Sequence, residues 1–282
     1  FGGEIMATAV ICEFNPFHNG HKYLLESAKK VLKEPIIAIM SGSFTQRGEV
    51  AVCDKFVRAK SALENGADLV LELPVVFSLS GAEGFAKAGV AIASAFYCTN
   101  HLAFGSESGD CELLKKSANA VCDERVQALV RDGMKNGGYY PRELESAVKT
   151  VFGDEISSVL CEPNNILGVE YIKALSGTGV EPFSVARTGV AHDSRIAGEG
   201  LASASHIREM LRNGENAKKY APYIPDEITF PENLDRPLLY RLRTMTREDI
   251  AKLPDVGEGL ENRIADAAMQ CSTSAEIADF VK

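Results

Sequence analysis

Short apolar runs along the chain alternate with amphipathic segments of helical spacing. The runs lie at residues 7–14, 35–40, 68–73, 101–104 and 182–187, and each is short enough for a single strand. Strands that alternate with helices predict a doubly wound α/β fold built on a parallel sheet. In such a sheet ligands bind beyond the carboxyl ends of the strands, so candidate functional residues are expected there.

Helical spacing fills the gaps between these runs. The predicted helices cover residues 19–33, 54–64, 81–96, 164–175 and 203–212. In the first helix the spacing predicts a buried face formed by Tyr23, Leu24, Ala28, Val31 and Leu32. Asp54 is the predicted N-cap of the second helix, because its carboxylate can accept hydrogen bonds from free amides of the first turn.

The same pattern divides the chain into parts. Residues 6–213 contain all the predicted strands and form an α/β domain, with a strand-free helical insertion at 110–160. After residue 213 the sequence changes to short segments punctuated by proline, which predict a small helical domain over 214–282. Residues 1–5 precede Met6 and are interpreted as a tag remnant.

Composition narrows the class of protein. The 282 residues are 45% hydrophobic and 24% charged, which is typical of a globular chain and excludes disordered and fibrous classes. The net charge of −9 gives no general attraction to nucleic acid or an anionic membrane. Without an apolar run of roughly 18 residues or a secretory pattern, we expect a cytoplasmic protein with no membrane partner. The seven scattered cysteines favour reduced thiols over disulfides or a zinc site.

The most informative segment, Asn15-Pro16-Phe17-His18-Asn19-Gly20-His21, follows the first predicted strand and opens a helix with His-x-Gly-His. Residues three apart on a helix face the same way, so both imidazoles point to one place. The helix N-terminus adds free N–H groups, and Gly20 lets a nucleotide approach the backbone. This combination suits an α-phosphate that gains charge while pyrophosphate leaves. The alternative is a pair of capping or surface histidines on an ordinary loop.

Two common nucleotide-binding patterns are absent from the sequence. It contains no G-x-x-x-x-G-K-[ST], which argues against a P-loop enzyme. No G-x-G-x-x-G follows the first predicted strand, which argues against a dinucleotide-binding domain. The histidine motif is therefore the principal nucleotide-site candidate.

Further motifs follow the first in a fixed order. They are Ser41-Gly42-Ser43-Phe44-Thr45-Gln46-Arg47-Gly48-Glu49, Asp54-Lys55, Arg58-Ala59-Lys60, Gly66-Ala67-Asp68-Leu69-Val70-Leu71-Glu72-Leu73-Pro74, Phe104-Gly105-Ser106-Glu107 and Pro163-Asn164-Asn165-Ile166-Leu167-Gly168. The series covers about residues 7–270 and resembles the bacterial tRNA(Met) cytidine acetate ligase family of the HIGH-motif nucleotidyltransferase superfamily. No lysine stands in a KMSKS-like position, which argues against the aminoacyl-tRNA synthetase branch.

This resemblance implies a Rossmann-like nucleotidyltransferase domain over residues 6–213 and a defined reaction. The enzyme would activate acetate with ATP as acetyl-adenylate, releasing pyrophosphate. It would then transfer the acetyl group to the wobble cytidine of elongator tRNA(Met), forming N4-acetylcytidine. Two alternatives stay open, namely a small-molecule adenylyltransferase of the same superfamily and a non-catalytic nucleotide-binding module.

The resemblance also implies an ATP site, with His18 and His21 as the catalytic pair on the phosphates. The segment around ATP would be Ile11, Cys12, Glu13, Phe14, Asn15, Pro16, Phe17, His18, Asn19, Gly20, His21, Lys22, Tyr23 and Leu24. The site would be completed by Gly105, Asn164 or Asn165, Arg187, Ser203, Ser205 and Arg208. The last three resemble the second superfamily signature, which holds the β- and γ-phosphates. On the residues alone, Arg187 could instead form a surface ion pair, and the asparagines and Ser203 could be helix caps.

The acceptor side is less defined. Acetate or tRNA could meet Gln46, Arg47, Lys55 and Arg58, or these side chains could be solvated around a capped helix. A basic cluster beside Tyr240 could contact tRNA and consists of Arg236, Arg241, Arg243 and Arg247. We expect Mg²⁺ to be held by the phosphates of ATP, without a dedicated protein site. Family members continue into a basic segment, so a truncated C-terminal domain is expected, and the oligomeric state is undetermined.

Overall fold

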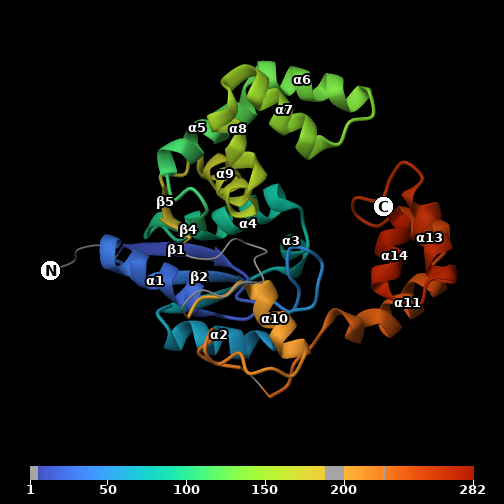
Figure 1. Cartoon of the computed structure of the whole chain (residues 1–282), viewed down its shortest axis with the longest axis horizontal. Coiled ribbons are helices and arrows are strands. Elements are labelled where there is room, and N and C mark those ends of the chain that lie inside the picture. Colours follow the sequence, from blue (N-terminus) through green and yellow to red (C-terminus); the bar gives the residue numbers. More distant parts are fainter. Residues whose placement is uncertain (1–5, 188–199, 225) are drawn as a thin grey trace.

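Five parallel strands form the centre of the molecule, in the order β3-β2-β1-β4-β5 (Figure 1). The computed structural model describes residues 6–187, 200–224 and 226–282. Residues 1–5, interpreted above as a tag remnant, lie outside the described part. The strands are β1 (Ala7–Cys12), β2 (Ile36–Ser41), β3 (Leu69–Leu73), β4 (Thr99–Ser106) and β5 (Glu181–Ala186). The predicted parallel α/β fold is therefore confirmed.

Helices cover both faces of this sheet. Successive side chains of β1 point to opposite faces, and so they enter two different cores. Ile11 packs in the core that includes α4 (Ala82–Ala95) and α9 (Pro163–Leu175). Val10 packs in the core that includes α1 (Asn19–Leu32). On this second side α2 (Lys55–Glu64) contributes Ala62, and its N-cap is Asp54, as predicted.

The predicted buried face of α1 was only partly right. Leu24, Ala28 and Leu32 pack in the core, but Tyr23 is 43% exposed and Val31 is 62% exposed. Leu25, which was not predicted, is completely buried. The face centred on Leu25 and Ala28 meets the sheet, so the helix is rotated relative to the stripe that its apolar residues suggest.

The region between β4 and α9 contains helices joined by turns and short loops and has no strand among its residues, as the spacing predicts. It consists of α5 (Cys111–Cys122), α6 (Glu124–Lys135), α7 (Tyr140–Phe152), α8 (Asp154–Ser158) and the short 3-10 helix η1 (Val159–Cys161). Asp110 and Asp123 cap α5 and α6, accepting hydrogen bonds from first-turn amides. In Figure 1 the α6–α7 hairpin extends away from the sheet.

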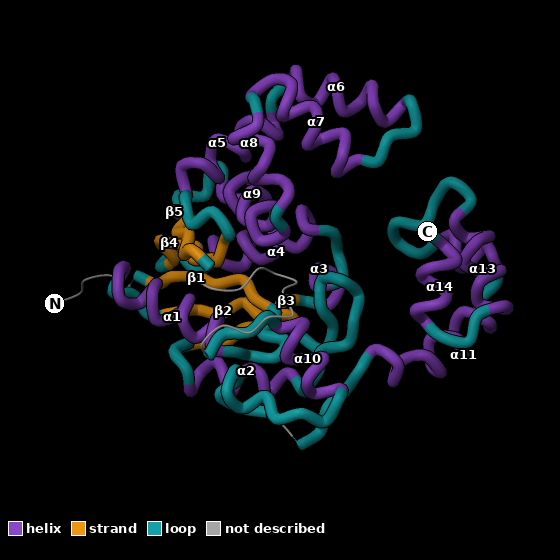
Figure 2. The backbone as a smooth tube through the Cα atoms, in the orientation of Figure 1, coloured by secondary structure: helices purple, strands orange, loops and turns teal. Residues whose placement is uncertain are grey.

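The last helices form a separate small core (Figure 2). They are η2 (Pro231–Leu234), α11 (Asp235–Thr244), α12 (Arg247–Ala251), α13 (Leu260–Gln270) and α14 (Ser274–Val281). Their core contains Leu239, Ala267 and Ile277. None of the helices in the described residues is both long and apolar enough to cross a membrane.

The segment between α10 and η2, which the sequence pattern groups with the helical domain, packs against the α/β part. Ala217 packs with Val52 and with α10 (Ala204–Arg212), and Phe230 joins the same cluster. The Thr229 N–H also donates to the Val52 carbonyl over 2.8 Å. This segment therefore belongs to the core of the α/β part, because its apolar side chains find their partners there.

Candidate functional site

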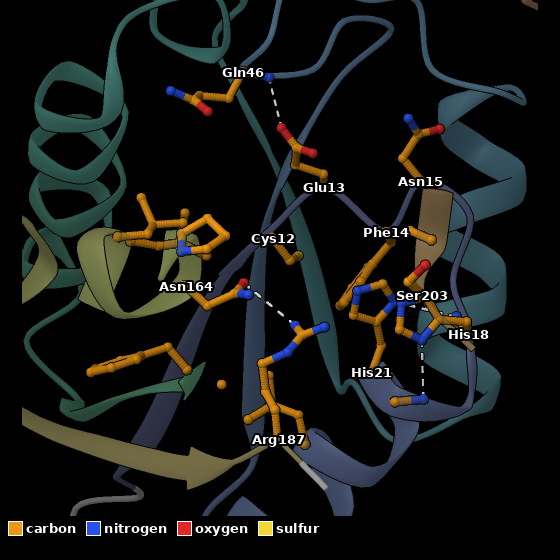
Figure 3. A pocket seen from close by; sticks show the side chains of 18 of the residues that line it. Cys12, Glu13, Phe14, Asn15, His18, His21, Gln46, Asn164, Arg187 and Ser203 are labelled. Carbon is orange, nitrogen blue, oxygen red and sulfur yellow. Dashed lines mark hydrogen bonds between the residues drawn. The ribbon is translucent and has the colours of Figure 1, made fainter. Parts of the chain in front are cut away.

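A cavity of about 310 Å³ lies at the carboxyl ends of β1, β4 and β5 (Figure 3). Its wall combines the first histidine motif with the starts of α4, α9 and α10. The expected site residues that line it are Ile11, Cys12, Glu13, Phe14, Asn15, His18, Gly20, His21, Tyr23, Leu24, Gln46, Arg47, Gly105, Asn164, Arg187, Ser203, Ser205 and Arg208. Segments far apart in the sequence therefore meet at the place where doubly wound folds bind ligands.

The two histidines cap α1 reciprocally. Nδ1 of His18 accepts from the Gly20 N–H over 3.0 Å, and Nδ1 of His21 accepts from the His18 N–H over 3.2 Å. The rings stack with centroids 3.6 Å apart. Because each Nδ1 is an acceptor, we infer that each neutral ring carries its proton on Nε2. Neither Nε2 has a hydrogen-bond partner in the described part of the chain, so two N–H donors remain for a ligand.

The surroundings keep both rings neutral. Burial, and then the positive charges of Arg187 and Arg208, lower the pKa of His18 from 6.5 to about 3. Burial, His18 and Arg187 likewise lower the pKa of His21 well below 6.5. Protonating either ring would also destroy the acceptor that caps α1. The pair can therefore donate hydrogen bonds to an anion but is poorly suited to act as a base.

The turn before α1 fixes these rings in place. Phe14 adopts a left-handed φ of 48°, which is strained for a residue with a side chain. Its buried ring lies edge-on to those of Phe17 and His21, with centroids 4.9 Å away in each case. Asn15 anchors the turn, because its Oδ1 accepts from the Val52 N–H over 2.6 Å.

A series of hydrogen bonds orients Arg187 on the side of the cavity opposite the histidines. Glu107 accepts from Nδ2 of Asn164 over 2.5 Å, which turns Oδ1 of Asn164 toward Arg187. The Arg187 guanidinium donates to that oxygen over 3.4 Å (Figure 3). Gly105 lies beside the same arginine, where a Cβ would stand 3.4 Å from its side chain. Arg187 thus faces the cavity as an oriented donor.

The start of α10 closes the cavity. Ser203 is its N-cap and accepts from the His206 N–H over 3.1 Å, so its hydroxyl has a structural role. Arg208 donates to the Asn15 carbonyl over 2.9 Å and to the Ser205 hydroxyl over 3.4 Å. The segment Ser203–Arg208 is therefore hydrogen-bonded directly to the histidine motif, although the two are far apart in the sequence.

Several expected residues lie elsewhere in the described structure. Pro16, Phe17, Asn19, Lys22 and Asn165 do not line the cavity. Asn165 is buried, and its Oδ1 accepts from the Ser108 N–H over 3.0 Å, so Asn164 is the member of the pair that faces the cavity.

Arg58 is the clearest correction. On the sequence alone Arg58 is a candidate contact for acetate or tRNA, but its side chain is buried, with 1% exposed. Its guanidinium donates to the carbonyls of Glu13, Ser41, Gly42 and Cys53. The neighbouring Lys55 forms an ion pair with Glu72 over 2.6 Å. Neither side chain lines the cavity. Arg58 instead links the segments that follow β1 and β2 through its hydrogen bonds to their carbonyls.

The predicted basic cluster is likewise smaller than the sequence suggests. Arg243 donates to the carbonyls of Ala268 and Cys271, and Arg247 donates to Asn262 and Asp266. Arg236 and Arg241 are exposed, and their guanidinium groups form no hydrogen bond or ion pair with a described residue. All four lie on or beside α11, away from the cavity lining.

Sequence reasoning missed the apolar wall of the cavity. Its main members are Phe85, Phe104, Ile166, Leu167 and Tyr171. Two polar residues of the loop after β2, Thr45 and Glu49, also line the cavity and were not among the expected site residues. Burial raises the pKa of the Tyr171 phenol, so the side chain is neutral. Apolar residues on helix faces look like ordinary core positions, and no local signal distinguishes those that border a cavity.

Comparison with known proteins gives a consistent picture. The family model HIGH Nucleotidyl Transferase matches residues 5–282. The tRNA(Met) cytidine acetate ligase of Clostridium tetani is 36% identical, and the match covers 98% of this chain and 74% of that protein. The enzyme of the same name from Caldanaerobacter subterraneus subsp. tengcongensis is 38% identical, with 98% and 72% covered.

Solved structures agree with these relatives. Thermotoga maritima TmcAL bound with alpha-thio ATP superposes with a TM-score of 0.87 at 33% identity, covering 98% of this chain and 70% of that one. Its apo form gives a TM-score of 0.89 at 32% identity, with 98% and 71% covered. The fold, the histidine motif and these matches together show that the chain belongs to the tRNA(Met) cytidine acetate ligase family of HIGH nucleotidyl transferases.

Proposed function

We propose that this chain is an ATP-dependent ligase that acetylates the wobble cytidine of elongator tRNA(Met) through an acetyl-adenylate. The observation that carries the proposal is the pair of neutral histidines at the start of α1, with Arg187 and Arg208 beside them. The family relationship supplies the substrates, and the cavity supplies a site in which an α-phosphate can react. The relatives act on tRNA, so a cytoplasmic location is part of the proposal.

In the first step, a carboxylate oxygen of acetate attacks the α-phosphorus of ATP. A new P–O bond forms, the bond to the β-phosphate oxygen breaks, and pyrophosphate leaves with the electron pair. Nε2–H groups of His18 and His21 would donate to the phosphate oxygens as their charge grows, and Arg208 with Ser205 would receive the departing pyrophosphate. Arg187, Asn164 and Gly105 would hold the nucleoside part.

Two carboxylates, Glu13 and Glu49, line the cavity within the described residues, and no group of three or more potential metal ligands occurs there. We propose that Mg²⁺ arrives with ATP, is held by phosphate and water and not by these two carboxylates, and would neutralise phosphate charge. Gln46 and Arg47 extend the cavity toward solvent and are proposed to meet acetate or tRNA. Arg236 and Arg241 are proposed to contact tRNA phosphates.

The test is pyrophosphate release from ATP, with acetate and tRNA added singly and together. We expect release that requires acetate and a tRNA-bound acetyl group when all three substrates are present. Release that ignores acetate and tRNA would contradict the ligase and favour a small-molecule adenylyltransferase. ATP binding without any release would favour a nucleotide-binding module.

A further inference from the structure

Glu13 places a carboxylate in a cavity whose other charged groups are chiefly cationic. It is half-buried at the end of β1, between the core and the turn that carries the histidines. One oxygen, Oε1, accepts from the Gln46 N–H over 2.6 Å and so holds the loop after β2 (Figure 3). The other oxygen has no hydrogen-bond partner among the described residues. The hydrogen bond to Gln46 occupies one carboxylate oxygen, and the second oxygen remains available to a ligand in the cavity.

Such a free oxygen is a poor neighbour for the reacting groups of the first step. The triphosphate of ATP and acetate are both anionic, and a carboxylate beside them raises their energy unless it meets a cation or an N–H donor. The exocyclic amine of cytidine offers N–H donors and becomes acidic as its nitrogen is acylated. Among the reacting groups of the two steps, this amine is therefore the one that best matches a second, unpaired carboxylate oxygen.

The position of Glu13 agrees with this match. Figure 3 shows Glu13 and Gln46 at one end of the cavity and Arg187 with Asn164 toward the other, with the histidines to one side. The β1–β2 side also carries Arg47, which is exposed and forms no hydrogen bond or ion pair with a described residue. An acceptor can thus enter from the solvent side of this loop while the nucleotide lies near β4 and β5.

We propose that Glu13 is a catalytic residue of the transfer step, where its free oxygen binds the cytidine N4 amine and takes a proton from it. This inference rests on the proposed function. The N4 lone pair attacks the acetyl carbon of acetyl-adenylate, and a C–N bond forms. The bond from that carbon to the phosphate oxygen breaks, AMP leaves with the electron pair, and one amine proton passes to the Glu13 carboxylate.

The decisive variant is Glu13→Gln, because its amide oxygen can still accept from the Gln46 N–H while the charge is removed. Acetyl-adenylate formation is measured without tRNA, by acetate-dependent ATP–pyrophosphate exchange and by trapping the adenylate with hydroxylamine. Acetyl transfer is measured separately with labelled acetate and tRNA(Met). We expect exchange and ATP KM within about threefold of the wild type and transfer lowered by about 100-fold or more, the usual effect of losing a general base.

The control is Glu64→Gln, which makes the same change of charge at the exposed end of α2, outside the cavity, and is expected to leave both half-reactions within threefold. Loss of both half-reactions in Glu13→Gln, or a raised KM for ATP or Mg²⁺, would assign the carboxylate to adenylation, adenine or metal and overturn the inference. Full transfer by Glu13→Gln would also overturn it. If the wild type shows no acetate-dependent exchange, the proposed function itself fails, a result that these variants do not mimic.

Discussion

At the residue scale, the chemistry depends on the protonation of two imidazoles. His18 and His21 each spend Nδ1 on a backbone N–H, which leaves Nε2–H as the group available to a ligand. Each ring therefore combines two roles, because Nδ1 caps the helix while Nε2–H can donate to phosphate. The cationic neighbours Arg187 and Arg208 further oppose protonation until an anion is bound.

Replacing His21 with alanine should abolish most adenylation. Losing one preorganised donor to developing charge costs about 100- to 1,000-fold in rate, and we expect acetate-dependent ATP–pyrophosphate exchange to fall accordingly. The lost bond to the His18 N–H should lower the free energy of unfolding by only about 1 kcal/mol. Urea denaturation checks the second value, and normal exchange by this variant would refute the assigned role of His21.

The low pKa of His18 predicts a pH-dependent stability. Its pKa is about 3 in the folded chain and 6.5 when exposed, so the unfolded state binds more protons between these values. The stabilising contribution is complete above pH 6.5 and is lost as pH falls toward 3. Between pH 7.5 and 5 this residue alone should cost about 2 kcal/mol of unfolding free energy. Urea denaturation of His18→Asn, which can still cap the helix, should show a smaller loss, and an equal loss would contradict the prediction.

At the element scale, the loops at the carboxyl ends of β1 and β2 are held together by Arg58. Burial lowers the pKa of its guanidinium, which donates hydrogen bonds to the backbone carbonyls of four residues. Arg58 therefore supports the segment that carries Glu13 and the turn before α1. Its contribution to function is indirect, through the geometry of the cavity.

Replacing Arg58 with methionine should destabilise the chain by roughly 3 kcal/mol or more, because several buried carbonyls lose their donor. The free energy of unfolding, measured by urea denaturation, checks this value. Lys55→Met is the matched control, since it breaks a more exposed ion pair that should contribute less than about 1 kcal/mol. A loss no larger than that of Lys55→Met would show that Arg58 is not a brace.

At the scale of the whole molecule, the helices after residue 230 add a second body with its own core. The Arg243 guanidinium donates to carbonyls near the end of α13, whereas the guanidinium of Arg241, two residues earlier, has no hydrogen-bond or ion-pair partner among the described residues. Arg243 therefore has a structural role, whereas Arg241 is available for the proposed contact with tRNA.

Arg241→Ala should weaken tRNA affinity several-fold and reduce the salt dependence of binding by about one phosphate contact. Its thermal stability and its acetate-dependent exchange should stay unchanged. Arg243→Ala should instead lower the free energy of unfolding by about 1–2 kcal/mol. Filter binding over a range of salt concentrations measures the affinities, and an Arg241→Ala variant with the wild-type salt slope would remove this surface from the proposed tRNA site.

Spacing within a few residues was enough to predict the main strands and helices and the position of the histidine motif, because periodicity and capping chemistry act over that range. The family followed from the resemblance of an ordered series of motifs. Which polar side chains remain available for a ligand depends on the folded chain, because their partners come from distant segments. Arg58, Arg243 and Asn165 carry the residue types of ligand-binding groups, yet each is occupied by partners that the fold brings from elsewhere. The second carboxylate oxygen of Glu13 could be recognised as unpaired only in the folded chain, because every neighbouring segment has to be in place before a missing partner can be seen.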